Sequence, residues 1–260
     1  MIKTRVNGIN LLLFPNLAGY KNITHFITTR EGGVSPEPYN TLNLAFHTGD
    51  QPRNVLKNRL ILARALGIAP EDIVNGEQVH GANVAIVSEK GLTPTATDGM
   101  VTNKPGICLL VLVADCVPLI FYDPRNRAIG VAHAGWKGTV AGISPKIVQT
   151  LCQEFNSEPE QLLVAIGPSI GPCCYEVQGD VVKIVRQALP DSQQLLSRHQ
   201  DRWYLDLVKA NEIQLLNAGV KQKNIQTANL CTRCHSKTFY SARASKGPTG
   251  RFGAGIMLNP

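Results

Sequence analysis

The stretch CVPLIFYDPRNRAIGVAH, residues 116–133, predicts a β-hairpin. The first and the last residue of this stretch, Cys116 and His133, are candidate metal ligands. Residues 117–122 are apolar and rich in strand-forming side chains, and residues 128–131 form a second apolar run. Between them, residues 123–126 read Asp-Pro-Arg-Asn, a combination that is typical of turns. We therefore expect two antiparallel strands joined by a short loop.

The register of this hairpin decides how close its two ends come. If Tyr122 faces Ala128, then His133 lies opposite Val117 and its imidazole comes within reach of Cys116. A slip of one residue would turn the His133 side chain to the other face of the sheet. The pairing predicts proximity of Cys116 and His133, and it leaves the register open.

A third candidate ligand, His80, lies upstream in the sequence Gln-Val-His-Gly. Two imidazoles and one thiolate suit zinc and would leave its fourth position open for chemistry. Two other interpretations fit the same residues. Cys116 could be a buried thiol beside hydrogen-bonded histidines, or it could be a nucleophile with His133 as its base.

Composition indicates a globular protein with a substantial core. The chain has 260 residues, of which 43% are hydrophobic and 17% charged, so we expect one domain spanning residues 1–260. The formal charge of +7 favours anionic partners. Because the Lys and Arg residues are scattered, we expect a pocket for phosphate and small molecules, and no nucleic-acid or membrane partner.

The lack of a recognisable targeting signal and the number of cysteines favour a cytoplasmic protein. The longest apolar run, Ile107 to Ala114, is too short to span a bilayer, and the N-terminus lacks a signal-peptide core. Seven cysteines without a secretory signal favour reduced thiols. The oligomeric state stays open.

Periodicity predicts a mixture of helices and strands. Helices are expected at 53–66, with Asp50 as cap, at about 139–155, bent near Pro145 or restarted at Ser144, and at 207–218. Strands are expected at 26–29, 84–87, 107–113, 162–166 and 255–258. Hairpins combined with crossovers favour an α/β (α+β) fold, a single-domain sandwich of mixed β-sheets flanked by helices.

Other cysteines and arginines have weaker signals. Cys231 and Cys234 have a spacing that often binds metal, but no second such pair completes a four-ligand zinc site. Cys173 and Cys174 are adjacent in a glycine- and proline-rich loop, so the role of these four cysteines stays open. Arg30 and Arg251 lie beside glycines and could bind an oxyanion, or they could be solvated loop residues.

Seven collinear motifs, running from about residue 25 to the C-terminus, carry a resemblance to a known family. They are TTREGGVS (28–35), EQVHG (77–81), TDGMV (97–101), ADCVP (114–118), AHAGW (132–136), GPSIGPCCYEV (167–177) and TGR (249–251). The chain closely resembles the laccase-domain purine nucleoside phosphorylases, some of which were called polyphenol oxidases or peptidoglycan editing factors.

The resemblance implies a sandwich of mixed sheets and a zinc site on His80, Cys116 and His133, which would also be the catalytic residues. It implies phosphorolysis of adenosine, inosine and methylthioadenosine, which is a transferase activity, with hydrolytic adenosine deamination as a second activity. The residues expected to bind substrate or phosphate are Arg30, Gln78, Lys137, Arg243 and Arg251.

The chain departs from the family pattern at two positions. Lys137 stands where many relatives have arginine, and it lacks the two-pronged guanidinium. Ala244 replaces the second arginine of a pair whose first member matches Arg243. Asp98 and Asp115 are both candidates to donate a proton to the leaving base.

Three other functions compete with this one. A copper-dependent polyphenol oxidase is disfavoured because the chain has only six histidines, although copper could replace zinc at a site of nitrogen and sulfur ligands. A cysteine-dependent amidase editing peptidoglycan precursors would use Cys116 and His133 without a catalytic metal. A non-catalytic binding module would need a fourth protein ligand, and Cys173, Cys174 and His235 are the first candidates.

Overall fold

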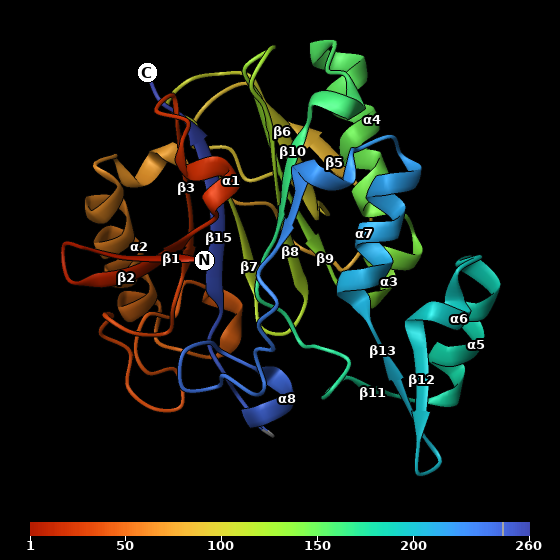
Figure 1. Ribbon diagram of the computed structural model, residues 1–260. Helices are drawn as coiled ribbons and strands as arrows, with labels where there is room; N and C mark the ends of the chain where they lie inside the picture. Colours follow the sequence, from red (N-terminus) through yellow and green to blue (C-terminus); the bar gives the residue numbers. More distant parts are fainter. Residues whose placement is uncertain (246) are drawn as a thin grey trace.

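Two six-stranded mixed sheets pack face to face in the computed structural model, which describes residues 1–245 and 247–260 (Figure 1). The first sheet has the order β1 (Ile2–Val6), β2 (Ile9–Leu13), β3 (Ile23–Thr28), β15 (Phe252–Leu258), β7 (Cys108–Val113), β4 (Ile73–Val74). The second has the order β14 (Ile225–Thr227), β10 (Leu163–Ile166), β8 (Val117–Asp123), β9 (Ala128–Ala134), β6 (Gly99–Thr102), β5 (Val84–Ile86). The predicted sandwich of mixed sheets is confirmed, and all five predicted strands belong to it.

Strand β7 shows how one apolar run supports two cores. Alternate side chains of a strand point to opposite faces, and all six residues of β7 are buried. Leu109, Val111 and Val113 face the second sheet, whereas Cys108 and Leu110 face the outer core. Because both faces are covered, the strand is apolar throughout and does not alternate with polar residues.

Helix α2 (Pro52–Leu66) covers the outer face of the first sheet, with Leu62 and Ala63 in the outer core. The helix ends as predicted at Gly67, which has a φ of 70°. Its start differs from the prediction, because Gln51 is the N-cap and Asp50 makes no cap. The Asp50 carboxylate is instead a buried acceptor for the Ser35 hydroxyl at 2.6 Å and the Asn43 amide at 3.0 Å.

Helices α3 (Trp136–Val140), α4 (Ile143–Phe155) and α7 (Leu207–Asn217) cover the outer face of the second sheet (Figure 1). Helix α7 follows the prediction closely, and Asp206 caps it by accepting from the Lys209 amide at 2.9 Å. Of the two predictions for residues 139–155, the restart is the closer one, because two helices form and the second begins at Ile143, one residue before Ser144. The break falls at Gly142, whose φ of 77° is a left-handed conformation that glycine adopts easily, and not at Pro145.

The β8–β9 hairpin forms with a register one residue away from the prediction. Tyr122 pairs with Ile129 and Pro118 pairs with His133, because β8 continues to Asp123 and the loop has four residues. The Asp123 carboxylate accepts from the Arg125 and Asn126 amides at 2.9 and 3.1 Å and thereby fixes the loop. The length and turn geometry of the loop set the register, and they cannot be predicted from the apolar pattern of the strands.

A small third sheet was not predicted. It has the order β11 (Glu176–Val177), β13 (Arg202–Leu205), β12 (Leu196–His199), and it lies beside α5 (Gly179–Ala188) and α6 (Ser192–Leu195) at one side of the molecule (Figure 1). Two short helices, α1 (Pro15–Ala18) and α8 (Ala242–Ser245), complete the structure.

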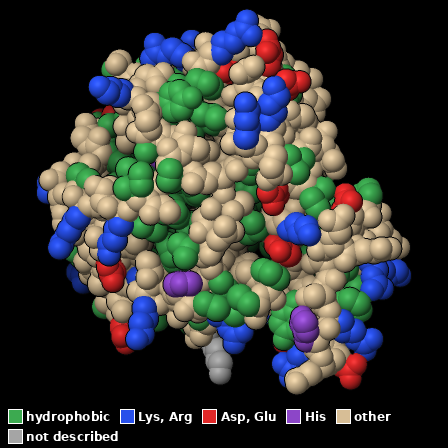
Figure 2. All heavy atoms as spheres, in the orientation of Figure 1, with side chains coloured by type: hydrophobic (Ala, Val, Ile, Leu, Met, Phe, Trp, Pro, Cys, Tyr) green, Lys and Arg blue, Asp and Glu red, His purple; other side chains and the backbone are tan. Residues whose placement is uncertain are grey.

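The face drawn in Figure 2 carries Lys and Arg side chains singly or in small groups, with Asp and Glu among them. This distribution agrees with the scattered charge in the sequence. Among the described residues, no helix has the length and hydrophobicity needed to cross a membrane.

Candidate functional site

The hairpin and a neighbouring loop bring three candidate metal ligands together. Cys116 directly precedes β8, His133 is the penultimate residue of β9, and His80 comes from the loop between β4 and β5. Their ligand atoms all lie within 4.8 Å of one another, and the two imidazole rings meet edge to face with centroids 4.8 Å apart. The predicted proximity is therefore present despite the shifted register.

One buried carboxylate holds this group in place. Asp98 precedes β6 and accepts four hydrogen bonds: one from Nδ1 of His133 at 2.7 Å and three from the backbone amides of Val79, His80 and Gly81. A carboxylate only accepts, so Nδ1 of His133 carries the proton and Nε2 is available as a ligand. The same carboxylate fixes His80, whose φ of 62° is unusual for histidine.

The electrostatics favour a thiolate at Cys116. Burial alone would raise the pKa of this thiol, but the imidazoles of His133 and His80 lower it to about 6. Burial would also lower the pKa of His133, whereas the Cys116 thiolate and the Asp98 carboxylate raise it. The Cys116 thiol is thus favoured in the thiolate form that metal binding requires, whereas the raised pKa of His133 favours the imidazolium, so metal binding would displace the Nε2 proton of His133.

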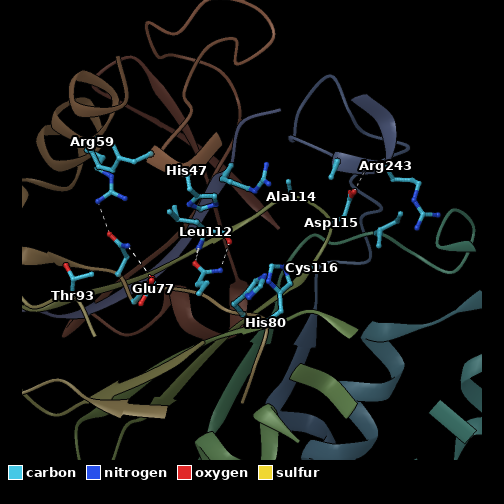
Figure 3. Close-up of a pocket in the computed structure, with 18 of the residues that line it drawn as sticks. His47, Arg59, Glu77, His80, Thr93, Leu112, Ala114, Asp115, Cys116 and Arg243 are labelled. Atoms are coloured by element: carbon cyan, nitrogen blue, oxygen red, sulfur yellow. Dashed lines mark hydrogen bonds between the residues drawn. The ribbon is translucent and has the colours of Figure 1, made fainter. Parts of the chain in front are cut away.

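These three residues open onto a cavity of about 1020 Å³ (Figure 3). In Figure 3, His80 and Cys116 lie near the middle, with Arg59 toward one end and Arg243 toward the other. The volume is at the upper end of the range for small-molecule sites. Further lining residues include Phe46, His47, Glu77, Gln78, Thr93, Asp115, Tyr175 and Arg251.

The cavity contains arginines without acidic partners. Among the described residues, Arg59, Arg243 and Arg251 form no ion pair with a carboxylate. Burial lowers the pKa of Arg59 to about 10 and also lowers that of Arg251. Placing cationic groups in a partly desolvated cavity is costly, and an anion bound beside them would offset that cost.

Of the five residues expected to bind substrate, three line the cavity and two lie outside its lining. Gln78, Arg243 and Arg251 line the cavity, but the Gln78 amide exchanges two hydrogen bonds with the Leu112 backbone at 2.9 and 2.8 Å. Arg30 lies elsewhere, where its guanidinium donates to Asn40 and Ser236 and covers the Tyr240 ring. Lys137 is exposed on α3, with its amine 5.8 Å from the centre of the Trp136 ring.

Several cavity residues were not found from the sequence, among them Phe46, His47, Arg59 and Tyr175. Phe46 and His47 come from a short 3₁₀ turn, Arg59 from the middle of α2, and Tyr175 from the loop before β11. Arg59 lies in the helix predicted at 53–66 with no role assigned to its side chain, Phe46 and His47 lie in no motif, and Tyr175 lies in the motif at 167–177 but was not singled out. The glycine- and proline-rich loop around residues 167–175 was the one available signal, because such loops often border pockets.

Comparisons with known proteins identify the family. The family model described as "Multi-copper polyphenol oxidoreductase laccase" matches residues 24–259. A purine nucleoside phosphorylase YlmD from Geobacillus stearothermophilus is 40% identical over 236 residues, which cover 86% of each chain. A purine nucleoside phosphorylase YfiH from Escherichia coli is 34% identical over 247 residues, covering 95% of this chain and 98% of the relative.

Solved structures have the same fold. The crystal structure of YlmD from Geobacillus stearothermophilus superimposes with a TM-score of 0.92 at 35% identity, covering 99% of this chain and 98% of that one. A Bacillus licheniformis protein, YfiH, gives a TM-score of 0.91 at 33% identity and covers 96% of both chains. The fold and these relatives agree, and the chain belongs to the multi-copper polyphenol oxidoreductase laccase family, whose relatives include proteins named purine nucleoside phosphorylase.

Proposed function

We propose that this protein is a zinc-dependent purine nucleoside phosphorylase that acts on adenosine, inosine and methylthioadenosine and also deaminates adenosine. One observation carries the proposal: an open group of two histidines and a cysteine shares its cavity with three arginines that lack acidic partners. The names of the relatives support the same activity. In phosphorolysis a phosphate oxygen bonds to the anomeric carbon, the glycosidic bond breaks, and the purine leaves with a proton.

The donor set fits zinc. His80, Cys116 and His133 would hold the ion, and its fourth position would face the cavity. When bound, zinc supplies Lewis acidity toward a substrate atom or a water molecule, and deamination needs the latter. Asp98 keeps His133 in the ligating tautomer and is therefore a positioning residue.

Copper oxidase chemistry fits the cavity less well. A blue-copper site adds a weak axial ligand, usually methionine, to two histidines and a cysteine. The lining residues include no methionine, and Gln78, the other possible axial ligand, already accepts from Leu112. Among the described residues, only His47 accompanies His80 and His133 in the lining, and one further histidine is too few to bind additional copper ions. Copper could still replace zinc, because sites of nitrogen and sulfur ligands generally prefer it.

We assign the phosphate to Arg243 and Arg251. Both line the cavity beside Asp115 and Cys116, and the side chain of Arg251 is tethered by the carbonyls of Thr249 and Gly250 at 2.9 and 3.0 Å. A tethered guanidinium loses little conformational freedom when it binds an anion. Positioning of phosphate and stabilisation of its charge would then dominate the rate enhancement.

We assign the purine to the end of the cavity formed by Phe46, Glu77 and Thr93. Phe46 is 46% exposed, an unusual position for a large apolar residue, and the Arg59 guanidinium lies 4.7 Å from the centre of its ring. An exposed ring backed by a guanidinium is a stacking platform for a purine. Glu77 and Thr93 could then accept hydrogen bonds from the purine edge.

The test is chromatography of purine products from zinc-loaded protein incubated with inosine, with and without phosphate. We expect hypoxanthine to appear only with phosphate, accompanied by ribose 1-phosphate in equal amount. Adenosine without phosphate should give inosine if deamination occurs. Protein that carries its metal and releases no hypoxanthine with phosphate would contradict the proposal.

A specific observation keeps the amidase as a second candidate. Cys116, His133 and Asp98 are arranged as a catalytic triad of nucleophile, base and orienting carboxylate, as in cysteine hydrolases. Removal of the metal separates the two functions. Chelation should abolish phosphorolysis, whereas an amidase would retain its activity under chelation and lose it on alkylation of Cys116.

We also propose that residues 1–260 form one domain and that the protein is cytoplasmic. All seven cysteines are free, as expected in a reducing compartment.

A further inference from the structure

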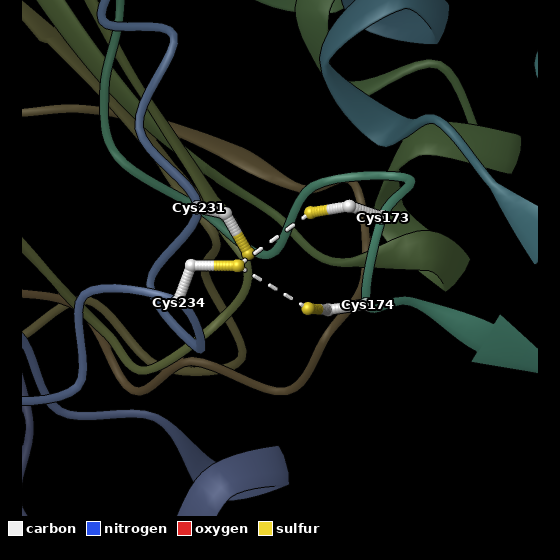
Figure 4. A group of neighbouring side chains, drawn as sticks. All are labelled: Cys173, Cys174, Cys231 and Cys234. Carbon is white, nitrogen blue, oxygen red and sulfur yellow. Dashed lines mark hydrogen bonds between the residues drawn. The ribbon is translucent and has the colours of Figure 1, made fainter.

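Four cysteines that the proposed reaction does not use lie together, outside the lining of the large cavity (Figure 4). Cys173 and Cys174 come from the loop between β10 and β11, and Cys231 and Cys234 from the segment between β14 and α8. All four sulfurs lie within 4.8 Å of one another. The Cys234 sulfur is 3.8 Å from that of Cys173 and 3.5 Å from that of Cys174.

We propose that these four cysteines, here called the cysteine cluster, bind a second zinc ion as a closed structural site. Zinc bound by four thiolates is tetrahedral with Zn–S distances of about 2.3 Å, which places the sulfurs about 3.8 Å apart. The two sulfur distances that involve Cys234 are close to this value. Binding displaces the thiol protons to solvent, and no oxidation is involved.

The cysteine cluster supplies the second pair of ligands that sequence spacing had failed to find. Cys231 and Cys234 have the two-residue spacing of a zinc knuckle, and the adjacent Cys173 and Cys174 complete the set across 57 to 61 residues of sequence. His235 does not compete as a ligand through Nδ1, because this atom lies 2.9 Å from the Cys231 carbonyl and is hydrogen-bonded to it. The geometry therefore favours four sulfur ligands.

Backbone hydrogen bonds hold the two segments side by side without any metal. The Ser169 amide donates to the Leu230 carbonyl at 3.2 Å, and the Thr232 amide donates back to the Ser169 carbonyl at 2.9 Å. The Gly171 amide donates to the Cys231 sulfur at 3.3 Å, a contact that stabilises a thiolate. The ligands are thus preorganised, and little conformational entropy is lost when the ion binds.

The position of the cysteine cluster indicates a structural role. The first segment carries Tyr175 and the second leads into α8, which carries Arg243, and both of these residues line the large cavity. These two residues already touch, with the Arg243 guanidinium 5.3 Å from the centre of the Tyr175 ring. A zinc ion linking the segments would fix this wall. Any effect of this zinc ion on turnover depends on the proposed function, whereas the number of zinc ions bound per chain does not.

The test is the zinc content per chain of protein purified without chelator, measured by mass spectrometry of the metal. We expect two zinc ions in the wild type and one each in Cys234→Ser and Cys116→Ala. The matched control Cys152→Ser changes a half-buried thiol of α4 outside both groups and should retain two. Circular dichroism checks that each variant is folded, and Cys173→Ser at an exposed position replaces Cys234→Ser if the latter fails to fold.

Cobalt substitution provides a readout independent of activity. Sulfur-to-cobalt charge-transfer absorption should fall steeply in Cys234→Ser and only slightly in Cys116→Ala, because the two sites contribute four sulfurs and one. A folded Cys234→Ser or Cys173→Ser variant with the wild-type zinc content would overturn the proposal. So would iron in place of zinc, or disulfides among these cysteines in freshly purified protein. One zinc retained in Cys116→Ala but lost in Cys234→Ser would support the cysteine cluster even if the first site were empty.

Discussion

Replacing Asp98 by asparagine tests whether this carboxylate positions the metal ligands. Oδ1 accepts from the His80 amide at 3.0 Å and from His133 Nδ1 at 2.7 Å, and Oδ2 accepts from the Val79 and Gly81 amides at 3.1 and 2.7 Å. Asparagine keeps only one oxygen, so two of the four donors would face an amide NH₂ group. The substitution conserves size and removes the geometry that fixes His80 and His133.

The expected losses follow from these contacts. At about 1.5–3 kcal/mol for each hydrogen bond to a charged group, two lost bonds lower the free energy of unfolding by about 3–6 kcal/mol. Loss of the partner of a ligating histidine lowers metal affinity by roughly 10- to 100-fold. Urea unfolding of the metal-free protein would measure the first quantity, and competition with a chromogenic chelator the second.

Asp123→Asn is the matched control at the other end of the same hairpin. Its carboxylate is also buried and also accepts backbone amides, those of Arg125 and Asn126. We expect this variant to lose stability while its affinity for the metal at His80, Cys116 and His133 stays at the wild-type value. If Asp98→Asn and Asp123→Asn had equal metal affinity, the positioning role of Asp98 would be refuted.

Three further outcomes are expected. Cys116→Ala should abolish phosphorolysis and deamination together because both use the same site, and product chromatography with each substrate would detect an activity that survives. Phe46→Ala should raise the KM for inosine roughly tenfold or more through lost stacking and leave the KM for phosphate unchanged, as initial rates would show. Burial lowers the pKa of His25 to about 4, below its ordinary value of 6.5, so the unfolded state binds the proton more readily. Its contribution to the free energy of unfolding should be complete above pH 6.5 and fall by about 3 kcal/mol toward pH 4. Urea unfolding at several pH values should show a flatter profile for His25→Gln.

The hairpin shows how far the sequence could predict this site. Turn residues and two apolar runs located both strands, and the closeness of Cys116 and His133 survived a register error of one residue because both lie at the open end of the hairpin. His80 could not be placed in this way. It is held by Asp98, a contact over 18 residues that no periodic pattern encodes. The cysteine cluster was missed for the same reason, because its pairs meet only through strand pairing and loop packing.

The aspartates also show why residue type alone could not choose the proton donor. Asp98 was a candidate proton donor, but although burial raises its pKa, hydrogen bonds from His133 and the backbone lower it overall, so it is ionised at neutral pH. The Asp115 carboxylate accepts from the Thr232 hydroxyl at 2.6 Å and the Arg243 amide at 2.7 Å, which ties Cys116 to the far wall of the cavity. Both carboxylates thus act as acceptors that join distant segments. An ionised Asp98 has no proton to donate, so we expect the proton for the leaving purine to come from another group, from water or from the phosphate itself. The activity of Asp98→Asn per bound metal ion should therefore stay near the wild-type value. If Asp98 were the proton donor, this activity would be lost.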